Sequence, residues 1–167
     1  MIGGAGRTSL IAAFGLLAAL ASSPAAAAKS CWADGRSSDN GEIAGVLARY
    51  GHYADARDGA ALAGLFTADG VWDLGAMGRF VGSEAIQGFV KGIAGASRHV
   101  TTNYAIDIAT DGTARARSYV TLLTLDEGRP VVRGAGIYED ELVRIGCAWK
   151  IKSRKYTPWK APAPPAQ

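Results

Sequence analysis

The chain has 167 residues, with 18 lysines and arginines against 15 aspartates and glutamates. The net charge of +3 is too small to indicate a protein that binds nucleic acid through its phosphates. Two histidines and two cysteines, without a Cys-x-x-Cys spacing, form no recognisable metal-binding motif. The length suits a single domain, and neither an internal repeat nor a linker divides it.

The N-terminus has the pattern of a cleavable signal peptide. Arg7 precedes the apolar run 10–20, and the small residues 24–28 follow it. The run is shorter than the ~20 residues that cross a bilayer as a helix. We therefore expect residues 1–28 to be removed and the mature protein to be periplasmic or secreted, with no membrane association. A disulfide between Cys31 and Cys147 would persist there, but the sequence leaves open whether these two cysteines are paired.

Three helices and two short strands are expected in the first half of the mature chain. Residues 29–40 are polar and read as a mobile lead-in, with Asn40 as the N-cap of a first helix. Asp58 is expected to cap a short second helix, and Gly82 opens a third. Extended pieces are expected at 71–74 and 79–81. The buried stripe of the first helix consists of Ile43, Val46, Leu47, Tyr50, Tyr53 and Ala54.

The second half has the pattern of hairpin-linked strands. Four runs, 98–108, 113–125, 131–144 and 149–157, are separated by turn signals. In the last run, alternation places Trp149 and Ile151 inward and the basic side chains of Lys150, Lys152 and Arg154 on a solvated outer face. We expect an α+β fold in which three helices cover one face of a curved antiparallel sheet. The domain would span 41–158, followed by a disordered Pro/Ala tail at 159–167.

Several segments carry a resemblance to a known family. They occur in consistent order over nearly all of the expected mature chain: Arg49-Tyr50, Asp55, Asp58-Gly59, residues 65–72, residues 82–86, Arg98-His99, Asn103, residues 136–140 and residues 149–151. In these segments the chain resembles the SnoaL-like branch of the nuclear transport factor 2-like superfamily. That branch includes scytalone dehydratase, bile-acid 7α-dehydratase and hexachlorocyclohexane dehydrochlorinase. The resemblance implies a cone-shaped fold.

The resemblance also implies the candidate catalytic residues. In the lyases of this group, an aspartate on the first helix orients a histidine on the first long strand, and the histidine takes a proton from the substrate. By position these are Asp55 and His99. Tyr50 matches a tyrosine that hydrogen-bonds or protonates the leaving group, and Asn103 matches an asparagine of the dehydrochlorinase. The dehydratases' further acidic or histidine side chain has no counterpart at Thr121 and Leu122.

These residue types suit proton abstraction. Imidazole titrates near neutrality, and a carboxylate on its far nitrogen fixes the tautomer and stabilises the imidazolium. A phenol suits the place where negative charge develops. This chemistry requires neither a metal nor an organic cofactor. We expect Trp72, Phe89, Tyr119 and Tyr138 to line an apolar pocket and His52 to lie at the surface.

The predicted function is a cofactor-independent lyase of the β-elimination or retro-aldol type, acting on a small apolar substrate that is aromatic or alicyclic. Two alternatives remain open. One is an isomerase of the ketosteroid-isomerase kind, which returns the proton to its substrate. The other is a non-catalytic protein that holds a hydrophobic ligand in the same cone. By analogy with related folds, which pair through the open face of the sheet, we expect a homodimer or homotrimer.

Overall fold

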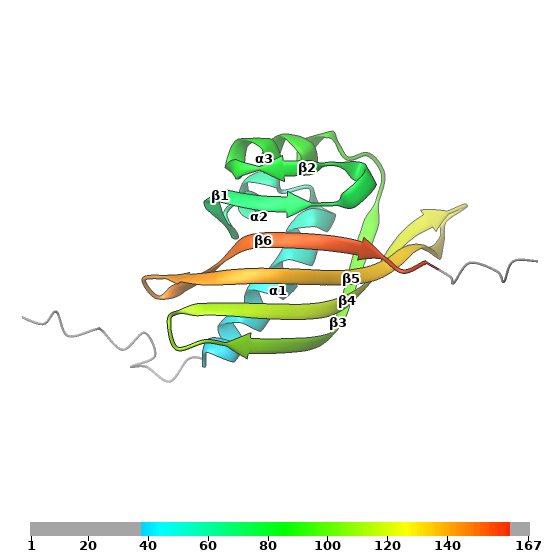
Figure 1. The fold of residues 1–167 in the computed structure, drawn as a ribbon. Coiled ribbons are helices and arrows are strands. Elements are labelled where there is room, and N and C mark those ends of the chain that lie inside the picture. Colours follow the sequence, from blue (N-terminus) through cyan, green and yellow to red (C-terminus); the bar gives the residue numbers. More distant parts are fainter. Residues whose placement is uncertain (1–37, 161–167) are drawn as a thin grey trace, which may run out of the picture.

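The computed structural model describes residues 38–160 and contains three helices and six strands (Figure 1). The predicted signal peptide, Cys31 and residues 161–167 lie outside the described residues. The expected α+β class is confirmed. The elements are α1 (Asp39–Ala56), α2 (Gly59–Ala63), β1 (Phe66–Asp73), the 3-10 turn η1 (Gly75–Met77), β2 (Arg79–Val81), α3 (Gly82–Gly92), β3 (Ser97–Ile108), β4 (Thr113–Asp126), β5 (Arg129–Ile145) and β6 (Ala148–Pro158).

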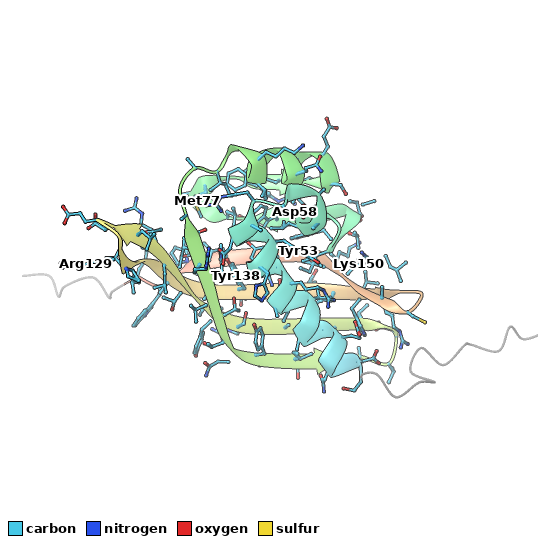
Figure 2. All side chains as sticks on the ribbon, turned by 180° about the vertical axis from the view of Figure 1, so that it is seen from behind. Tyr53, Asp58, Met77, Arg129, Tyr138 and Lys150 are labelled. Carbon is cyan, nitrogen blue, oxygen red and sulfur yellow. The ribbon has the colours of Figure 1, made fainter. Side chains whose placement is uncertain are left out.

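The six strands form one curled sheet in the order β2-β1-β6-β5-β4-β3. All neighbouring strands are antiparallel except β1 and β6, which pair in parallel. The helices lie on one side of the sheet, with α1 running across it (Figure 2). The strand β3 is therefore an edge strand whose inner face is covered by α1.

The first helix begins two residues earlier than the sequence suggested. Its N-cap is Ser38, not Asn40, because Ser38 is extended and its side chain accepts a hydrogen bond from the Gly41 backbone N–H at 3.3 Å. Asp39 lies in the first turn, where its carboxylate accepts a hydrogen bond from Trp149 Nε1 at 2.9 Å. The helix start is thus tied to β6. The predicted cap of α2 is confirmed, since Asp58 accepts from the Ala61 N–H at 2.9 Å.

The strand β1 begins at Phe66 rather than at the expected residue 71. Phe66 pairs with Ile151 of β6, and an irregularity separates this pair from the regular pairing that resumes at Val71. The partner strand lies more than 80 residues further along the chain, so the local pattern does not reveal this pairing. No helix among residues 38–160 is both long and apolar enough to cross a bilayer.

The core lies between the helices and the inner face of the sheet. All six apolar residues of the predicted stripe on α1 belong to it, with Tyr53 only partly buried. The sheet contributes inward-facing residues from β1, β4, β5 and β6, and α3 contributes Ile86 and Val90. Burial of each such side chain stabilises the fold by about 1.5–3 kcal/mol. This packing fixes α1 over the sheet.

A β-bulge in β6 changes which side chains point inward. Leu142 of β5 pairs with Ile151, but the adjacent Glu141 pairs with Ser153, which leaves Lys152 as an extra residue. Trp149 and Ile151 point inward, as expected. Arg154 was expected on the outer face with the lysines, and this expectation is wrong. The extra residue shifts the alternation by one, so Arg154 points into the core.

The buried Arg154 pairs with Asp140 of the neighbouring strand. Arg154 Nε donates to Asp140 Oδ1 at 2.6 Å, and Nη2 donates to Oδ2 at 2.9 Å. Both side chains are 0% exposed. Burial favours a lower pKa for Arg154, but the Asp140 carboxylate more than offsets it, so the pKa rises and the guanidinium stays charged. The core therefore contains a bidentate ion pair.

Asp140→Ala should lower the free energy of unfolding by about 3–5 kcal/mol, because it leaves the Arg154 charge buried without a partner. Urea unfolding followed by circular dichroism measures this loss. Glu141→Ala is the matched control: Glu141 is exposed and should cost less than about 1 kcal/mol. Equal losses in the two variants would contradict the prediction.

Candidate active site

Asp55 and His99 are joined by a short hydrogen bond. Asp55 lies in the last turn of α1, and His99 is the third residue of β3. The distance from Asp55 Oδ1 to His99 Nδ1 is 2.7 Å. The carboxylate also accepts from the His99 backbone N–H at 3.0 Å and from Ser97 Oγ at 3.3 Å. The His99 and Asp55 side chains are 13% and 12% exposed, so they lie mostly out of water.

Asp55 lies toward the sheet because α1 passes very close to β3. Helical periodicity alone places Asp55 away from the centre of the buried stripe. One turn earlier, however, a Cβ atom added at Gly51 would lie 3.3 Å from the Cβ of His99. This close approach brings the last turn of α1 against the first residues of β3. The flank of α1 that carries Asp55 therefore faces the edge strand.

The hydrogen bond assigns the protons of the His99 ring. A carboxylate accepts hydrogen bonds and donates none, so the neutral imidazole facing Asp55 carries its hydrogen on Nδ1. Its Nε2 then has a free lone pair that can accept a proton. The backbone contact from His99 to the same carboxylate holds both residues in this orientation. The pair has the geometry of a base with its positioning residue.

Tyr50 lies beside His99 on the inner side of α1. Its ring packs edge-on against His99, Trp72 and Tyr138, with ring centres 5.9, 5.8 and 5.5 Å apart, respectively. Burial raises the pKa of Tyr50 above its ordinary value, although the nearby charge of Arg154 opposes this. The phenol therefore keeps its proton at neutral pH. It can donate a hydrogen bond next to the imidazole.

A largely apolar cavity of about 370 Å³ opens beside these residues, a size that suits a small molecule. The structure brings Tyr50, His99, Trp72, Phe89 and Tyr138 together in its wall. Figure 2 shows Tyr138 on the helix-covered side of the sheet. The remaining lining residues come mainly from the α3–β3 connection and the inner face of β4, β5 and β6: Ala54, Arg57, Leu74, Met77, Ile93, Ala94, Gly95, Ala96, Ser97, Val120, Leu122, Thr124, Leu125, Gly134 and Tyr156.

Besides Asp55, which contacts His99 but does not line the cavity, two expected site residues do not reach it. Tyr119 lies on the outer face of β4 and is 53% exposed, because its neighbours Ser118 and Val120 are the ones that point inward. Asn103 is exposed at a bulge in β3, where its φ of 57° is left-handed. In both cases the local strand geometry, which the resemblance does not specify, turns the side chain away.

The cavity residues that the sequence analysis did not assign to the site include Arg57 and Tyr156. Arg57 ends α1 in a left-handed conformation and donates to the carbonyl oxygens of Ala54 and Gly95 at 2.8 and 2.5 Å. It thereby ties the helix end to the loop that lines the cavity. Tyr156 follows the bulge in β6 and points inward, and its hydroxyl donates to the Ala135 carbonyl at 3.1 Å. The inward orientation of Tyr156 could have been predicted only if the bulge in β6 had been recognised.

A second hollow lies on the other side of the Asp55–His99 pair. It is an open groove of about 500 Å³ between α1 and β3, lined by Asp55, His99 and mostly small or polar side chains: Ala48, Gly51, His52, Ala56, Arg98, Thr101 and Tyr104. His52 is exposed, as expected. The pair thus forms part of the wall between an apolar cavity and a polar groove.

The described residues show no metal-binding cluster and leave the disulfide prediction open. Among residues 38–160, no group of three or more His, Cys, Asp or Glu side chains could hold a metal ion. Cys147 is disulfide-bonded, whereas Cys31, the other cysteine of the sequence, lies outside the described residues. The pairing of these two cysteines therefore stays a prediction.

The fold agrees with a comparison to known families. The model of the SnoaL-like domain matches residues 35–155. The chain belongs to the SnoaL-like family. A search of curated proteins found no match.

Solved structures share the fold of this SnoaL-like domain. An NTF2-like protein with a cystatin-like fold from Novosphingobium aromaticivorans has a TM-score of 0.70 and 24% identity, covering 75% of this chain and 84% of its own. A protein of the same bacterium, proposed to be an aromatic ring hydroxylase, has 28% identity and a TM-score of 0.65, covering 74% and 90%. Another, proposed to be a scytalone dehydratase, has 22% identity and a TM-score of 0.64, covering 72% and 84%.

Asp55→Asn should remove the preference of His99 for the Nδ1–H tautomer, because an amide can donate as well as accept. Long-range ¹H–¹⁵N correlation spectra distinguish the two tautomers. His52, whose ring has no hydrogen-bond partner among residues 38–160, is the internal control and should be the same in both proteins. An unchanged His99 spectrum in the variant would contradict the assignment.

Proposed function

We propose that this SnoaL-like protein is a cofactor-independent lyase that uses His99 as its base. The observation that carries the proposal is the 2.7 Å hydrogen bond between Asp55 and His99 in the wall of an apolar cavity. The similar structures proposed to be a dehydratase and a ring hydroxylase agree with small-molecule chemistry in such a cavity. The substrate would be small, apolar, and aromatic or alicyclic.

In an elimination, His99 Nε2 takes the proton of a substrate C–H bond. The electron pair of that bond forms the new double bond as the leaving group departs with its own pair. Asp55 stabilises the imidazolium that forms. Tyr50 donates a hydrogen bond or its proton to the departing group. If Tyr50 has given its proton, the imidazolium proton restores the Tyr50 hydroxyl; if it has not, the imidazolium proton passes to the departing group or to water. In a retro-aldol reaction the same base takes a hydroxyl proton, the C–C bond breaks and an aldehyde is released.

The cavity suits a neutral substrate. Aromatic rings form much of its wall, and the wall residue Phe89 stacks on Phe80, which is not a lining residue, at 4.1 Å between ring centres. The charge of Arg154, behind the tyrosine rings, is already balanced by Asp140. At the rim, the side chains of Met77 and Leu125 are exposed, so an apolar ligand would meet apolar surface as it enters.

His99→Ala should lower turnover by about 10²–10⁴-fold, the usual contribution of a positioned base. The assay incubates the protein in heavy water with cyclic ketones, β-hydroxy ketones and halogenated cyclohexanes, and proton NMR follows both deuterium uptake and fragment release. Asp55→Asn should lower turnover less than His99→Ala, since it leaves the imidazole in place. His52→Ala is the control and should retain wild-type turnover.

The outcomes separate the three candidate functions. Release of a fragment that depends on His99 supports the lyase. Deuterium uptake without a released fragment supports an isomerase instead. If His99→Ala stays within about threefold of wild type on every compound that the wild type converts, His99 is not the base. Binding without any conversion would support a non-catalytic ligand-binding protein.

A further inference from the structure

Arg57 is the one charged residue among the described residues that line the apolar cavity. It follows the last turn of α1, and its guanidinium donates to the carbonyl oxygens of Ala54 and Gly95 at 2.8 and 2.5 Å. These two bonds leave other N–H groups of the guanidinium unused. Since Gly95 is exposed, this end of the cavity wall lies near solvent.

Arg57 has no carboxylate partner. Of the arginines among residues 38–160, Arg57 and Arg154 are the two that are not exposed. Arg154 is paired with Asp140, whereas no aspartate or glutamate of these residues forms an ion pair with Arg57. Withdrawing a charge from water without an opposite charge is unfavourable, and two carbonyl oxygens offset only part of that cost. An anionic group of a ligand would supply the missing charge.

The backbone at Arg57 gives an independent reason to look for a role of its side chain. Its φ of 59° and ψ of 25° are left-handed, a conformation that glycine adopts most easily at the end of a helix. Among residues 38–160, Asn103 and Glu127 are the only other non-glycine residues with a positive φ. Glycine would end α1 with less strain, but it would bring no cation to the cavity wall.

We propose that Arg57 binds a carboxylate group of the substrate, so that the substrate is a small ring compound with one such group. The proposal rests on the proposed function and narrows its substrate class. Hydrogen bonds between a guanidinium and a carboxylate are about twice as strong as those between neutral groups. The pair that they form is neutral as a whole, so the ring of the substrate still meets an apolar wall.

The position of Arg57 suits a residue that orients the substrate. Gly95, to which it donates, lies four residues before His99, and both line the cavity together with Tyr50. A substrate held at its carboxylate by Arg57 therefore lies in the same cavity as the proposed base. Arg57 takes part in no bond-breaking step. If it served only to fasten the end of α1 to Gly95, its replacement would weaken charged and neutral ligands alike.

The test compares 2-naphthoate with 2-naphthamide, a neutral amide on the same ring system, by isothermal titration calorimetry. Wild type should bind 2-naphthoate about 10–100-fold more tightly than 2-naphthamide, the usual effect of hydrogen bonds between charged groups. Arg57→Gln should weaken 2-naphthoate binding by about that factor and leave 2-naphthamide binding within about threefold. Arg57→Lys keeps the charge without the planar guanidinium and should keep part of the preference.

Two further variants are controls. Arg98 lies in the groove on the other side of His99 and donates to the Ser97 carbonyl at 2.7 Å, so Arg98→Gln removes a neighbouring arginine that does not line the cavity. Both affinities should stay within about threefold of wild type. His99→Ala should keep the preference for 2-naphthoate, which separates the effect of Arg57 from that of an imidazolium. Circular dichroism confirms that each variant is folded.

The outcomes decide the proposal even if a variant fails to fold. It is overturned if wild type binds 2-naphthoate no more tightly than 2-naphthamide, a comparison that needs no variant. It is also overturned if folded Arg57→Gln keeps the preference or weakens both ligands equally. His99-dependent turnover without a carboxylate preference would refute the carboxylate site alone. A carboxylate preference without such turnover would refute the lyase alone.

Discussion

The carboxylate of Asp55 holds the end of α1 against the first residues of β3. It accepts hydrogen bonds from the backbone and ring of His99 and from the Ser97 hydroxyl. Since β3 is the edge strand, it has a β neighbour on one side only, and α1 supplies its other contact. The same carboxylate therefore positions an edge strand and orients an imidazole. The packing of α1 on β3 and the orientation of the imidazole therefore depend on the same side chain.

His99 and Tyr50, the two groups to which the proposed function assigns chemistry, are each in contact with a charged side chain that is not part of the cavity wall. His99 presents one ring nitrogen to the cavity and gives the other to Asp55. Tyr50 presents its hydroxyl, while Arg154 stacks on its ring. Asp55 and Arg154 stay out of the wall, where Arg57 is the one charged residue among the lining residues described, and the wall remains largely apolar. A fold shared by proteins of varied activity thus acquires its chemistry from a few side chains and their supports.

Local patterns in the sequence were enough to predict the elements with strong periodicity. The stripe on α1, the Asp58 cap and the four hairpin-linked strands were all found from spacing alone. The contact between Asp55 and His99 could not be predicted from local spacing. Periodicity placed Asp55 at the surface, and only the family resemblance indicated its partner. The contact depends on the close approach at Gly51, which is a tertiary feature.

The errors at Asn103, Arg154 and Tyr156 share a physical cause. A prediction from alternation assumes that each residue of a strand pairs with one residue of the neighbouring strand. A bulge adds an unpaired residue, and the amino-acid sequence gives no sign of it. Arg154 and Tyr156 were therefore assigned to the wrong face or overlooked, and Asn103 was placed by analogy at a bulge that turns it outward. The parallel pairing of β1 with β6 was hidden because the two strands are far apart in sequence.

The single extra residue at Lys152 divides β6 into two stretches. Odd-numbered residues point inward before it, and even-numbered residues point inward after it. A relative that lacked this residue but carried the same amino acids after the position of Trp149 would expose the counterpart of Arg154 to solvent. Residues of this strand are therefore equivalent between relatives only when counted back from its C-terminal end. The presence or absence of this one residue in β6 thus determines whether the arginine of a family member lies beneath the cavity or in solvent.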